Sequence, residues 1–181
     1  QALLDLYTMH RSFQESGGIR KKRYAFVGDL LRGRAVRSSV MLLSQYKDVE
    51  MEFIAPSSFQ IAADLEEYLL SQDIKIHKTD NLESVISSVD CIYMTRIQDE
   101  YDLSGESNLI DFSQYSLTPD NVSRMKTDSI ILHPLPRRHE ISPEVDADPR
   151  AMYWRQLRNG VNIRAALLLY VFNVAHRLRE Y

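Results

Sequence analysis

Short apolar runs alternate with amphipathic stretches along most of the 181 residues. Apolar runs of four or five residues between turn-forming or charged residues are typical of buried strands, whereas apolar positions that recur every three or four residues are typical of helices. Five segments fit the first description: 24–27, 51–55, 74–77, 90–94 and 129–132. The third of them alternates apolar and polar residues, so we expect it at the outer edge of a sheet.

Helices are predicted between these strands and at both ends of the chain. Helical spacing in the first of them is shown by Leu3, Leu6, Tyr7, His10 and Phe13, before Gly17 and Gly18 end it. A second amphipathic face is formed by Phe59, Ala62, Leu65, Tyr68 and Leu69. We expect helices over about 35–46, 58–71, 81–86 and 120–125, and a long one over about 165–179, after an irregular approach through Trp154.

This alternation predicts an α/β fold of three layers, α/β/α, with a five-stranded parallel sheet between two layers of helices. We expect the Rossmann-like strand order 3-2-1-4-5. The strands at 24–27 and 90–94 are then neighbours, and the chain changes direction between them. Ligands of open α/β sheets bind at such a switch point, beyond the carboxyl ends of the strands. The loops after Val27 and Met94 should therefore carry the site.

Composition narrows the class of protein. The length fits one domain over residues 1–181, and a net charge of −3 gives no basic surplus for nucleic acid. No apolar run reaches the ~18–20 residues of a membrane span. The lone Cys91 excludes an internal disulfide and fits a reducing compartment such as the cytoplasm. The five histidines lack the spacing of a metal site, so we expect no metal and no cofactor.

The loop after the first strand, from Gly28 to Ala35, contains a candidate anion ligand. It matches neither a dinucleotide fingerprint nor a phosphate-binding P-loop. Gly28 and Gly33 permit tight turns, and Arg34 falls near the start of the next helix, where free N–H groups favour anions. An arginine fork suits a carboxylate or a phosphate. A surface arginine in a turn would explain this loop equally well.

A second arginine follows the fourth strand, in the sequence Thr95-Arg96-Ile97-Gln98-Asp99-Glu100. Gln98 can donate to a carboxylate or accept from an amine. Alternatively, Arg96 pairs with Glu100 and pins the loop, which is compatible with ligand binding. Two arginines at one crevice predict an anion with two charged groups, either a dicarboxylic amino acid or a phosphorylated substrate.

The segment after the fifth strand is His133-Pro134-Leu135-Pro136-Arg137. Its two prolines remove two backbone donors and fix two φ angles. The carbonyls around Leu135 are then rigid acceptors that can hold an –NH2 group. A stiff turn without a ligand is the alternative, and a single histidine such as His133 is more often structural than catalytic.

Together these three segments, in order and spacing, resemble the aspartate carbamoyltransferases. Residues 1–6 and 159–168 resemble the two helices that cross between the two domains of that family, so we expect 1–16 and 165–179 to be interdomain helices. The sibling ornithine carbamoyltransferases typically carry His-Cys-Leu-Pro and Asp-x-x-x-Ser-Met-Gly segments, and neither occurs here.

The resemblance implies a role for each matched residue. Arg34 and Arg96 would hold the carboxylates of L-aspartate, with Gln98 in support. The carbonyls of Leu135 and Pro136 would hold the amino group of carbamoyl phosphate, which Gln1 would also touch. Supporting positions would be Gly33, Glu100, Pro134 and Arg137. The implied reaction yields N-carbamoyl-L-aspartate and phosphate in de novo pyrimidine biosynthesis, in a parent enzyme that is a homotrimer.

Some features depart from the family pattern. Ala35 stands where a threonine is usual, and Asp99 and Tyr101 stand where lysine and arginine are common. The Ser-Thr-Arg-Thr phosphate loop and the loop lysine of a neighbouring subunit are absent, and the sequence begins mid-pattern without an initiator Met. We therefore expect an aspartate-binding domain without its carbamoyl-phosphate domain, inactive alone. An exposed apolar patch is expected at Leu3, Leu4, Leu168 and Tyr170.

Two other functions fit the same pattern. One is a non-catalytic module of the same fold that binds an amino acid or a partner. The other is an unrelated nucleotide-binding domain of the Rossmann type. Protection by nucleotides would favour the second, whereas binding of aspartate that is lost in Arg96→Ala would favour the carbamoyltransferase interpretation.

Overall fold

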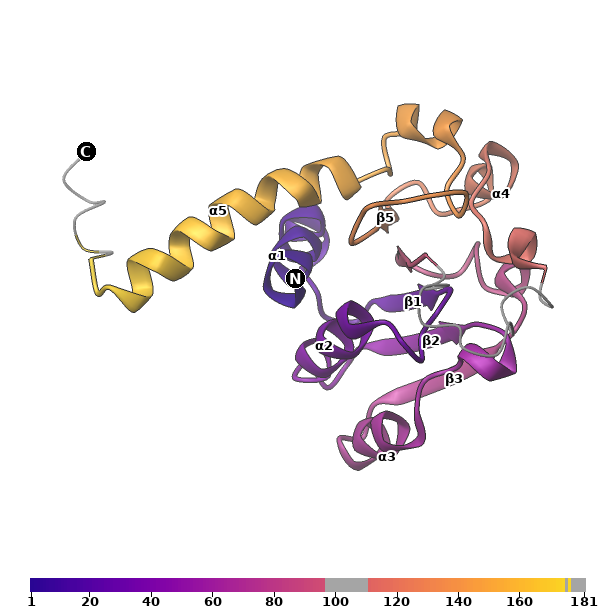
Figure 1. The fold of residues 1–181 in the computed structure, drawn as a ribbon, viewed down its shortest axis with the longest axis horizontal. Coiled ribbons are helices and arrows are strands. Elements are labelled where there is room, and N and C mark those ends of the chain that lie inside the picture. The colour runs from indigo at the N-terminus through magenta and orange to yellow at the C-terminus, as the bar shows by residue number, and fades with distance from the viewer. Residues whose placement is uncertain (97–110, 175, 177–181) are drawn as a thin grey trace.

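The structure, a computed structural model, describes residues 1–96, 111–174 and 176. A parallel sheet forms the middle layer (Figure 1), with the strand order β3-β2-β1-β4-β5. Its strands are β1 (Arg23–Val27), β2 (Glu50–Ile54), β3 (Lys75–Thr79), β4 (Cys91–Met94) and β5 (Ile130–Leu132). The predicted order and the edge position of the third strand are confirmed.

Helices cover both faces of this sheet. They are α1 (Ala2–Ser12), α2 (Arg34–Leu43), α3 (Ala63–Ser71), α4 (Pro119–Ser123) and α5 (Tyr153–Val171). The first three pack their apolar residues on one face, against β-strand side chains such as Phe26 and Phe53. The other face is covered by α4, the start of α5 and short 3-10 turns, around Ile92 and Ile131. The layered architecture is therefore the predicted one.

Register places the ends of the two central strands together. Val27 is paired with Ile54 on one side and with Met94 on the other. Just beyond the strands, the Thr95 N–H donates to the Val27 carbonyl at 2.8 Å and the Thr95 hydroxyl donates to it at 2.9 Å. The loops after β1 and β4 thus leave the sheet side by side.

The last helix differs from its prediction. It begins at Tyr153 rather than near residue 165, includes the supposedly irregular segment around Trp154, and ends at Val171. Its polar first half is stabilised by contact with α1, where Gln156 and Gly160 are buried. A Cβ at Gly160 would lie 2.8 Å from the flexible Arg164 guanidinium and 3.4 Å from the Leu4 side chain of α1, the second an ordinary contact distance.

Two other helical predictions were too long. The segment expected at 81–86 forms a single 3-10 turn, Leu82–Ser84, capped by the Asn81 side chain. The segment expected at 58–71 is divided, because residues 60–62 are extended between a 3-10 turn at Ser57–Phe59 and α3. Gln60 fixes this break by donating to the carbonyl of Phe53 at 3.0 Å.

The buried face of α1 also differs from the one that its apolar residues predicted. Its buried positions are Leu4, Asp5, Thr8 and Met9. Leu3 is 48% exposed, and the expected exposure of Leu4 is wrong. Asp5 and Thr8 can be buried because both are hydrogen-bonded, and burial of a polar group is unfavourable only when it has no partner.

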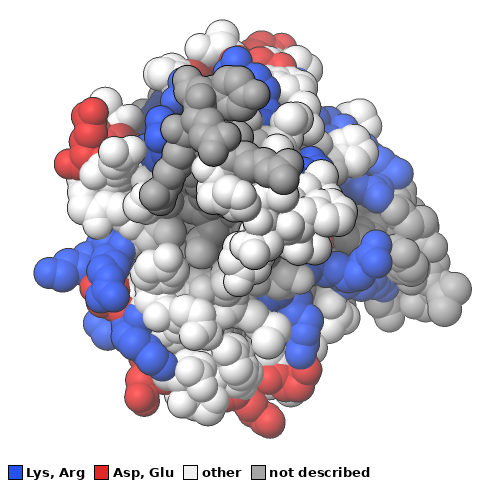
Figure 2. Space-filling view, turned by 90° about the vertical axis from the view of Figure 1, so that its left-hand side faces the viewer, with Lys and Arg blue, Asp and Glu red and all other residues white. Residues whose placement is uncertain are grey.

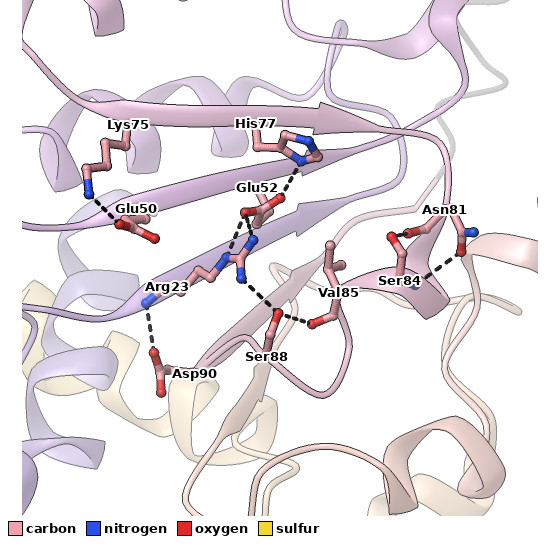
Figure 3. A network of polar contacts seen from close by, with 10 residues as sticks. All are labelled: Arg23, Glu50, Glu52, Lys75, His77, Asn81, Ser84, Val85, Ser88 and Asp90. Carbon is pink, nitrogen blue, oxygen red and sulfur yellow. Dashed lines mark hydrogen bonds and ion pairs between the residues drawn. The ribbon is translucent and has the colours of Figure 1, made fainter.

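A network of charged side chains lies across β1, β2 and β3 (Figure 3). The buried carboxylate of Glu52 accepts from Arg23 Nε at 2.7 Å and is 2.9 Å from His77 Nδ1. Arg23 also donates to the Ser88 hydroxyl at 3.0 Å and, through its backbone N–H, to Asp90 at 2.8 Å. A buried charge is tolerated when it is paired and hydrogen-bonded, and here the pairs connect β1, β2 and β3.

Candidate functional site

A cavity of about 450 Å³ lies beyond the carboxyl ends of the central strands, where the topology placed the site. It is lined by Gln1, Gly33, Arg34, Ala35, Ser38, Thr95, Arg96, His133, Pro134, Leu135 and Pro136. These residues come from the start of α1, the start of α2, the end of β4 and the segment after β5. The described lining residues include two arginines and no acidic residue, so the cavity suits an anion.

The structure brings together seven of the ten predicted site residues: Gln1, Gly33, Arg34, Arg96, Pro134, Leu135 and Pro136. Ala35, the departure next to Arg34, lines the cavity as well. Gln98 and Glu100, like Asp99 and Tyr101, lie outside the described residues. The tenth, Arg137, lies next to the cavity and is directed elsewhere.

Two glycines shape the loop between β1 and α2. Gly28 has a φ of 112°, and a Cβ there would lie 2.3 Å from the Thr95 carbonyl oxygen. Only glycine lets the loops after β1 and β4 touch in this way. A Cβ at Gly33 would lie 2.7 Å from the Asp29 carbonyl oxygen. Gly33 precedes α2, so Arg34 is the first residue of that helix, beside backbone N–H groups that favour an anion.

The segment after β5 is held by a buried histidine. The Leu135 N–H donates to His133 Nδ1 at 2.8 Å, so Nδ1 is an acceptor and the ring proton is on Nε2. His133 Nε2 then donates to Glu140 at 2.7 Å. Leu135 has a φ of 52°, uncommon for leucine, and its peptide bond to Pro136 is cis. The hydrogen bond to His133 holds the backbone of Leu135, and both Leu135 and Pro136 line the cavity.

Glu140 acts on this histidine as a carboxylate. Burial alone would raise the pKa of the Glu140 carboxyl, but the hydrogen bond from His133 and those from backbone N–H groups outweigh it and leave the pKa below its ordinary value. One of these backbone donors is the Arg138 N–H, at 3.1 Å. Because Glu140 stays ionised, it can only accept, which fixes the tautomer of His133.

Arg137 fastens the other end of this segment. Its guanidinium makes a two-point ion pair with Asp146, with 2.7 Å between Nη2 and Oδ2. It also lies over the rings of Tyr153 and Trp154, at 5.6 Å and 5.8 Å from their centroids. Arg137 thus connects the cavity loop to the start of α5.

Gln1, a predicted site residue, belongs to a group whose other members the sequence did not single out. The Asp5 carboxylate is completely buried and accepts four hydrogen bonds, from Gln1, Ser39, Tyr93 and Gln156. We call these five residues the Asp5 cluster. Their one visible signal in the sequence is that Gln1, Asp5 and Thr8 recur at helical spacing, so that a carboxylate shares a face with buried residues.

The fold and the cavity define a class: a doubly wound parallel α/β domain that binds a small anion at its switch point. Residues 20–171 match the family model for the aspartate/ornithine carbamoyltransferase Asp/Orn binding domain. The chain belongs to this family. That membership decides against the nucleotide-binding alternative.

Named relatives agree with the family assignment. Aspartate carbamoyltransferase 1, chloroplastic, of Pisum sativum is 40% identical over 170 residues, which cover 93% of this chain and 43% of the relative. The aspartate carbamoyltransferase catalytic subunit of Alkaliphilus oremlandii is 43% identical over 169 residues, which cover 93% of this chain and 50% of the relative. The chain thus spans about half the length of such relatives.

Solved structures are similar over the same extent. Aspartate transcarbamoylase from Trypanosoma cruzi, in complex with N-(phosphonacetyl)-L-aspartic acid, has a TM-score of 0.84 and 34% sequence identity, over 92% of this chain and 53% of that one. The catalytic subunit of M. jannaschii aspartate transcarbamoylase has a TM-score of 0.82 and 36% identity, over 92% of this chain and 54% of that one.

Proposed function

We propose that this chain is the aspartate-binding half of an aspartate carbamoyltransferase, which converts carbamoyl phosphate and L-aspartate to N-carbamoyl-L-aspartate and phosphate. The observation that carries the proposal is the cavity, which Arg34, Arg96, Leu135 and Pro136 line together at the switch point of the sheet. The cavity thus offers cations for a dicarboxylate and acceptors for an amide within one space.

The two arginines are the ligands of aspartate. Arg34, at the start of α2, and Arg96, after β4, each offer a planar fork that can hold a carboxylate at two points. We assign Gln98 a supporting contact from the same loop as Arg96, with Glu100 steadying that loop. Gly33 supports Arg34 by allowing the tight turn before α2.

The acceptors on the opposite wall hold carbamoyl phosphate. The carbonyls of Leu135 and Pro136 accept from its –NH2 group, and Gln1 contacts the same ligand. Pro134 and Arg137 keep this wall in place. The α-amino group of aspartate attacks the carbamoyl carbon, a tetrahedral species forms and phosphate leaves. Catalysis comes from orientation and charge stabilisation, without a covalent intermediate.

With Arg34 and Arg96 assigned to aspartate, the described lining residues leave the phosphate without a cationic partner, so we propose a second, carbamoyl-phosphate-binding domain. It would pack against α1 and the second half of α5, the parts of the predicted interdomain helices that expose apolar side chains. These are Leu3, Leu167, Leu168, Tyr170 and Val171. The second half of α5 projects from the body (Figure 1), and charges of both signs lie around an uncharged area on that side (Figure 2).

The setting of the activity is also part of the proposal. We assign it to de novo pyrimidine biosynthesis and to a homotrimer; one relative is the multifunctional protein CAD of Squalus acanthias. No helix in the described part of the chain is long and apolar enough to cross a membrane. The free thiol of the buried Cys91 suits the cytoplasm, although the plant relatives are named chloroplastic. Cell fractionation distinguishes these compartments.

Calorimetric titration with N-(phosphonacetyl)-L-aspartic acid, which joins both substrate halves, tests the function. The chain should bind it when a carbamoyl-phosphate domain is also supplied, because only then are all its charges met. Arg96→Ala should weaken binding by roughly 2–5 kcal/mol, since it leaves a carboxylate unpaired in the cavity.

A matched control is available on α2. Arg37 pairs with Asp64 on the exposed side of that helix, outside the cavity, so Arg37→Ala should leave the affinity unchanged. Equal affinities of the Arg96→Ala and unmutated proteins would contradict the assignment of the site.

A further inference from the structure

Four elements of the fold, α1, α2, β4 and α5, meet at one buried carboxylate. Asp5 Oδ1 accepts from Gln1 Nε2 at 2.8 Å and from Gln156 Nε2 at 2.6 Å. Its other oxygen, Oδ2, accepts from the Ser39 hydroxyl at 2.8 Å and from the Tyr93 hydroxyl at 2.9 Å. The two oxygens thus have different partners: Oδ1 accepts from two side-chain amides, and Oδ2 accepts from two hydroxyl groups.

The amide side leads directly to the cavity. Gln1 lines the cavity, and one N–H of its Nε2 is bound to Asp5, which fixes the plane of the amide and leaves Oε1 as its acceptor for a ligand. Gln156 is fixed at both ends, because its Oε1 accepts from the His133 N–H at 2.9 Å. His133 in turn holds the Leu135 N–H. Oδ1 of Asp5 is therefore connected to two parts of the cavity wall, directly to Gln1 and through Gln156 to the segment after β5.

Among the described titratable groups around this site, Asp5 is the one whose hydrogen-bond geometry suits a charge. Burial raises the pKa of Tyr93 and of Cys91, the titratable neighbours from β4, so both stay neutral. Burial also raises the pKa of Asp5, although the hydrogen bonds from Gln156, Ser39, Tyr93 and Gln1 all act in the opposite direction. Four donors aimed at one group match an ionised carboxylate, which accepts and does not donate.

We propose that Asp5 is a positioning residue for carbamoyl transfer: it orients the Gln1 amide with Oε1 toward the cavity and, through Gln156, holds the His133–Pro136 segment. This inference rests on the proposed function. The Gln1 oxygen and the Leu135 and Pro136 carbonyls then form one set of acceptors for the amino group of the carbamoyl substrate. Asp5 itself, buried behind Gln1, touches no substrate.

Three substitutions separate positioning from simple stability. Asp5→Leu keeps the number and branching of the side-chain heavy atoms but removes both acceptors. Asp5→Asn can keep its oxygen toward Gln1 and Gln156, because its –NH2 can donate to Ser39 and Tyr93, whose hydroxyl groups can also accept. Tyr93→Phe removes a buried hydrogen bond on the Oδ2 side only. It should destabilise the protein without turning the Gln1 amide.

Kinetics of the whole protein, with every domain it carries, test the proposal. Asp5→Leu should raise KM for carbamoyl phosphate roughly tenfold and lower kcat by roughly 10²-fold, with KM for aspartate nearly unchanged, because misplaced groups impair the reaction steeply. Asp5→Asn should recover most of both values, and Tyr93→Phe should leave both KM values within about twofold. Equal rises in both KM values for Asp5→Leu, or no recovery in Asp5→Asn, would overturn the proposal.

A spectroscopic measurement separates this inference from the function on which it rests. In ¹⁵N-labelled protein, the side-chain NH2 signals of Gln1 and Gln156 and the His133 backbone signal should all move in Asp5→Leu and stay in place in Tyr93→Phe. If the unmutated protein shows no carbamoyl transfer, the proposed function fails, and these signals still decide the geometry. Unmoved signals in Asp5→Leu would overturn it. If Asp5→Leu does not fold, Gln156→Met should raise KM for carbamoyl phosphate alone. An unchanged KM would overturn the part of the proposal that concerns the His133–Pro136 segment.

Discussion

His133 is held in a single tautomer by its two neighbours. Its Nδ1 accepts from the Leu135 N–H and its Nε2 donates to Glu140. The same ring position fixes a leucine in a left-handed backbone conformation, which residues other than glycine rarely adopt. Such conformations persist where surrounding contacts enforce them, often at functional sites.

Glu140→Gln should reduce stability at neutral pH. The folded-state pKa of Glu140 is below its ordinary value of 4.5, so ionised Glu140 contributes stability above about pH 4.5, and that contribution is lost as the pH falls through the folded-state pKa. We expect a loss of about 1.5–3 kcal/mol at pH 7, the range for a hydrogen bond to a charged group. Urea unfolding at pH 7 and below pH 4.5 should show that the difference in the free energy of unfolding between the two proteins shrinks in acid. A difference that is the same at both pH values would contradict the expectation.

Gly28→Ala tests the contact between the two cavity loops. Its Cβ would lie 2.3 Å from the Thr95 carbonyl oxygen, so backbone must move, and we expect a loss of stability of about 3 kcal/mol or more together with weaker ligand binding. Gly17→Ala is the control. Its φ is 91°, but nothing lies within 4 Å of the new Cβ, so only the conformational strain of about 1–2 kcal/mol applies. Thermal unfolding of both variants measures the two losses of stability. Equal losses would contradict the close contact between Gly28 and Thr95.

Elements with a strong local pattern were predictable. Four strands are apolar runs with clear ends and the third alternates apolar and polar residues, and the order followed from the rules for parallel sheets. The positions of Arg34 and Arg96 could therefore be inferred. The first half of α5 could not be predicted, because its polar residues become helical through contact with α1. In the same way, the apolar residues of α1 pointed to the wrong face, since the buried face carries Asp5 and Thr8.

Long-range contacts limited what could be inferred about the site. The cavity arginines and the His133–Pro136 segment follow strands directly, so topology alone brings them together. Asp5 and Gln156 lie 151 residues apart and meet through helix packing that no local pattern encodes. The predicted contributions of Gln98 and Glu100 remain predictions, since both lie outside the described residues.

The whole molecule has one end that is apolar and exposed. Large side chains with high exposure gather on the second half of α5, among them Leu168 (59%), Tyr170 (80%) and Val171 (73%). Apolar patches of this kind mark contact surfaces or cause association. The proposed second domain would cover this end, and without it the surface is available to other copies of the chain.

The isolated chain should therefore associate as its concentration rises. Leu168→Glu combined with Tyr170→Glu should reduce association, because charges then lie on the contact surface; sedimentation velocity over a range of concentrations measures it. Leu70→Glu, on α3, changes a side chain of similar exposure (55%) away from α5 and should leave association unchanged. A chain that stays monomeric at every concentration would contradict the expectation.

The contact between Asp5 and Gln156 has a consequence for the time at which the cavity can form. The two residues are separated by 151 positions, so a ribosome that adds about 5–20 residues per second needs roughly 8–30 s to bring the second out after the first. During that interval α1 has no α5 to pack against, and the Asp5 carboxylate stays in water. The sheet can assemble first, whereas the walls that Asp5 holds are completed only when synthesis has passed the last strand.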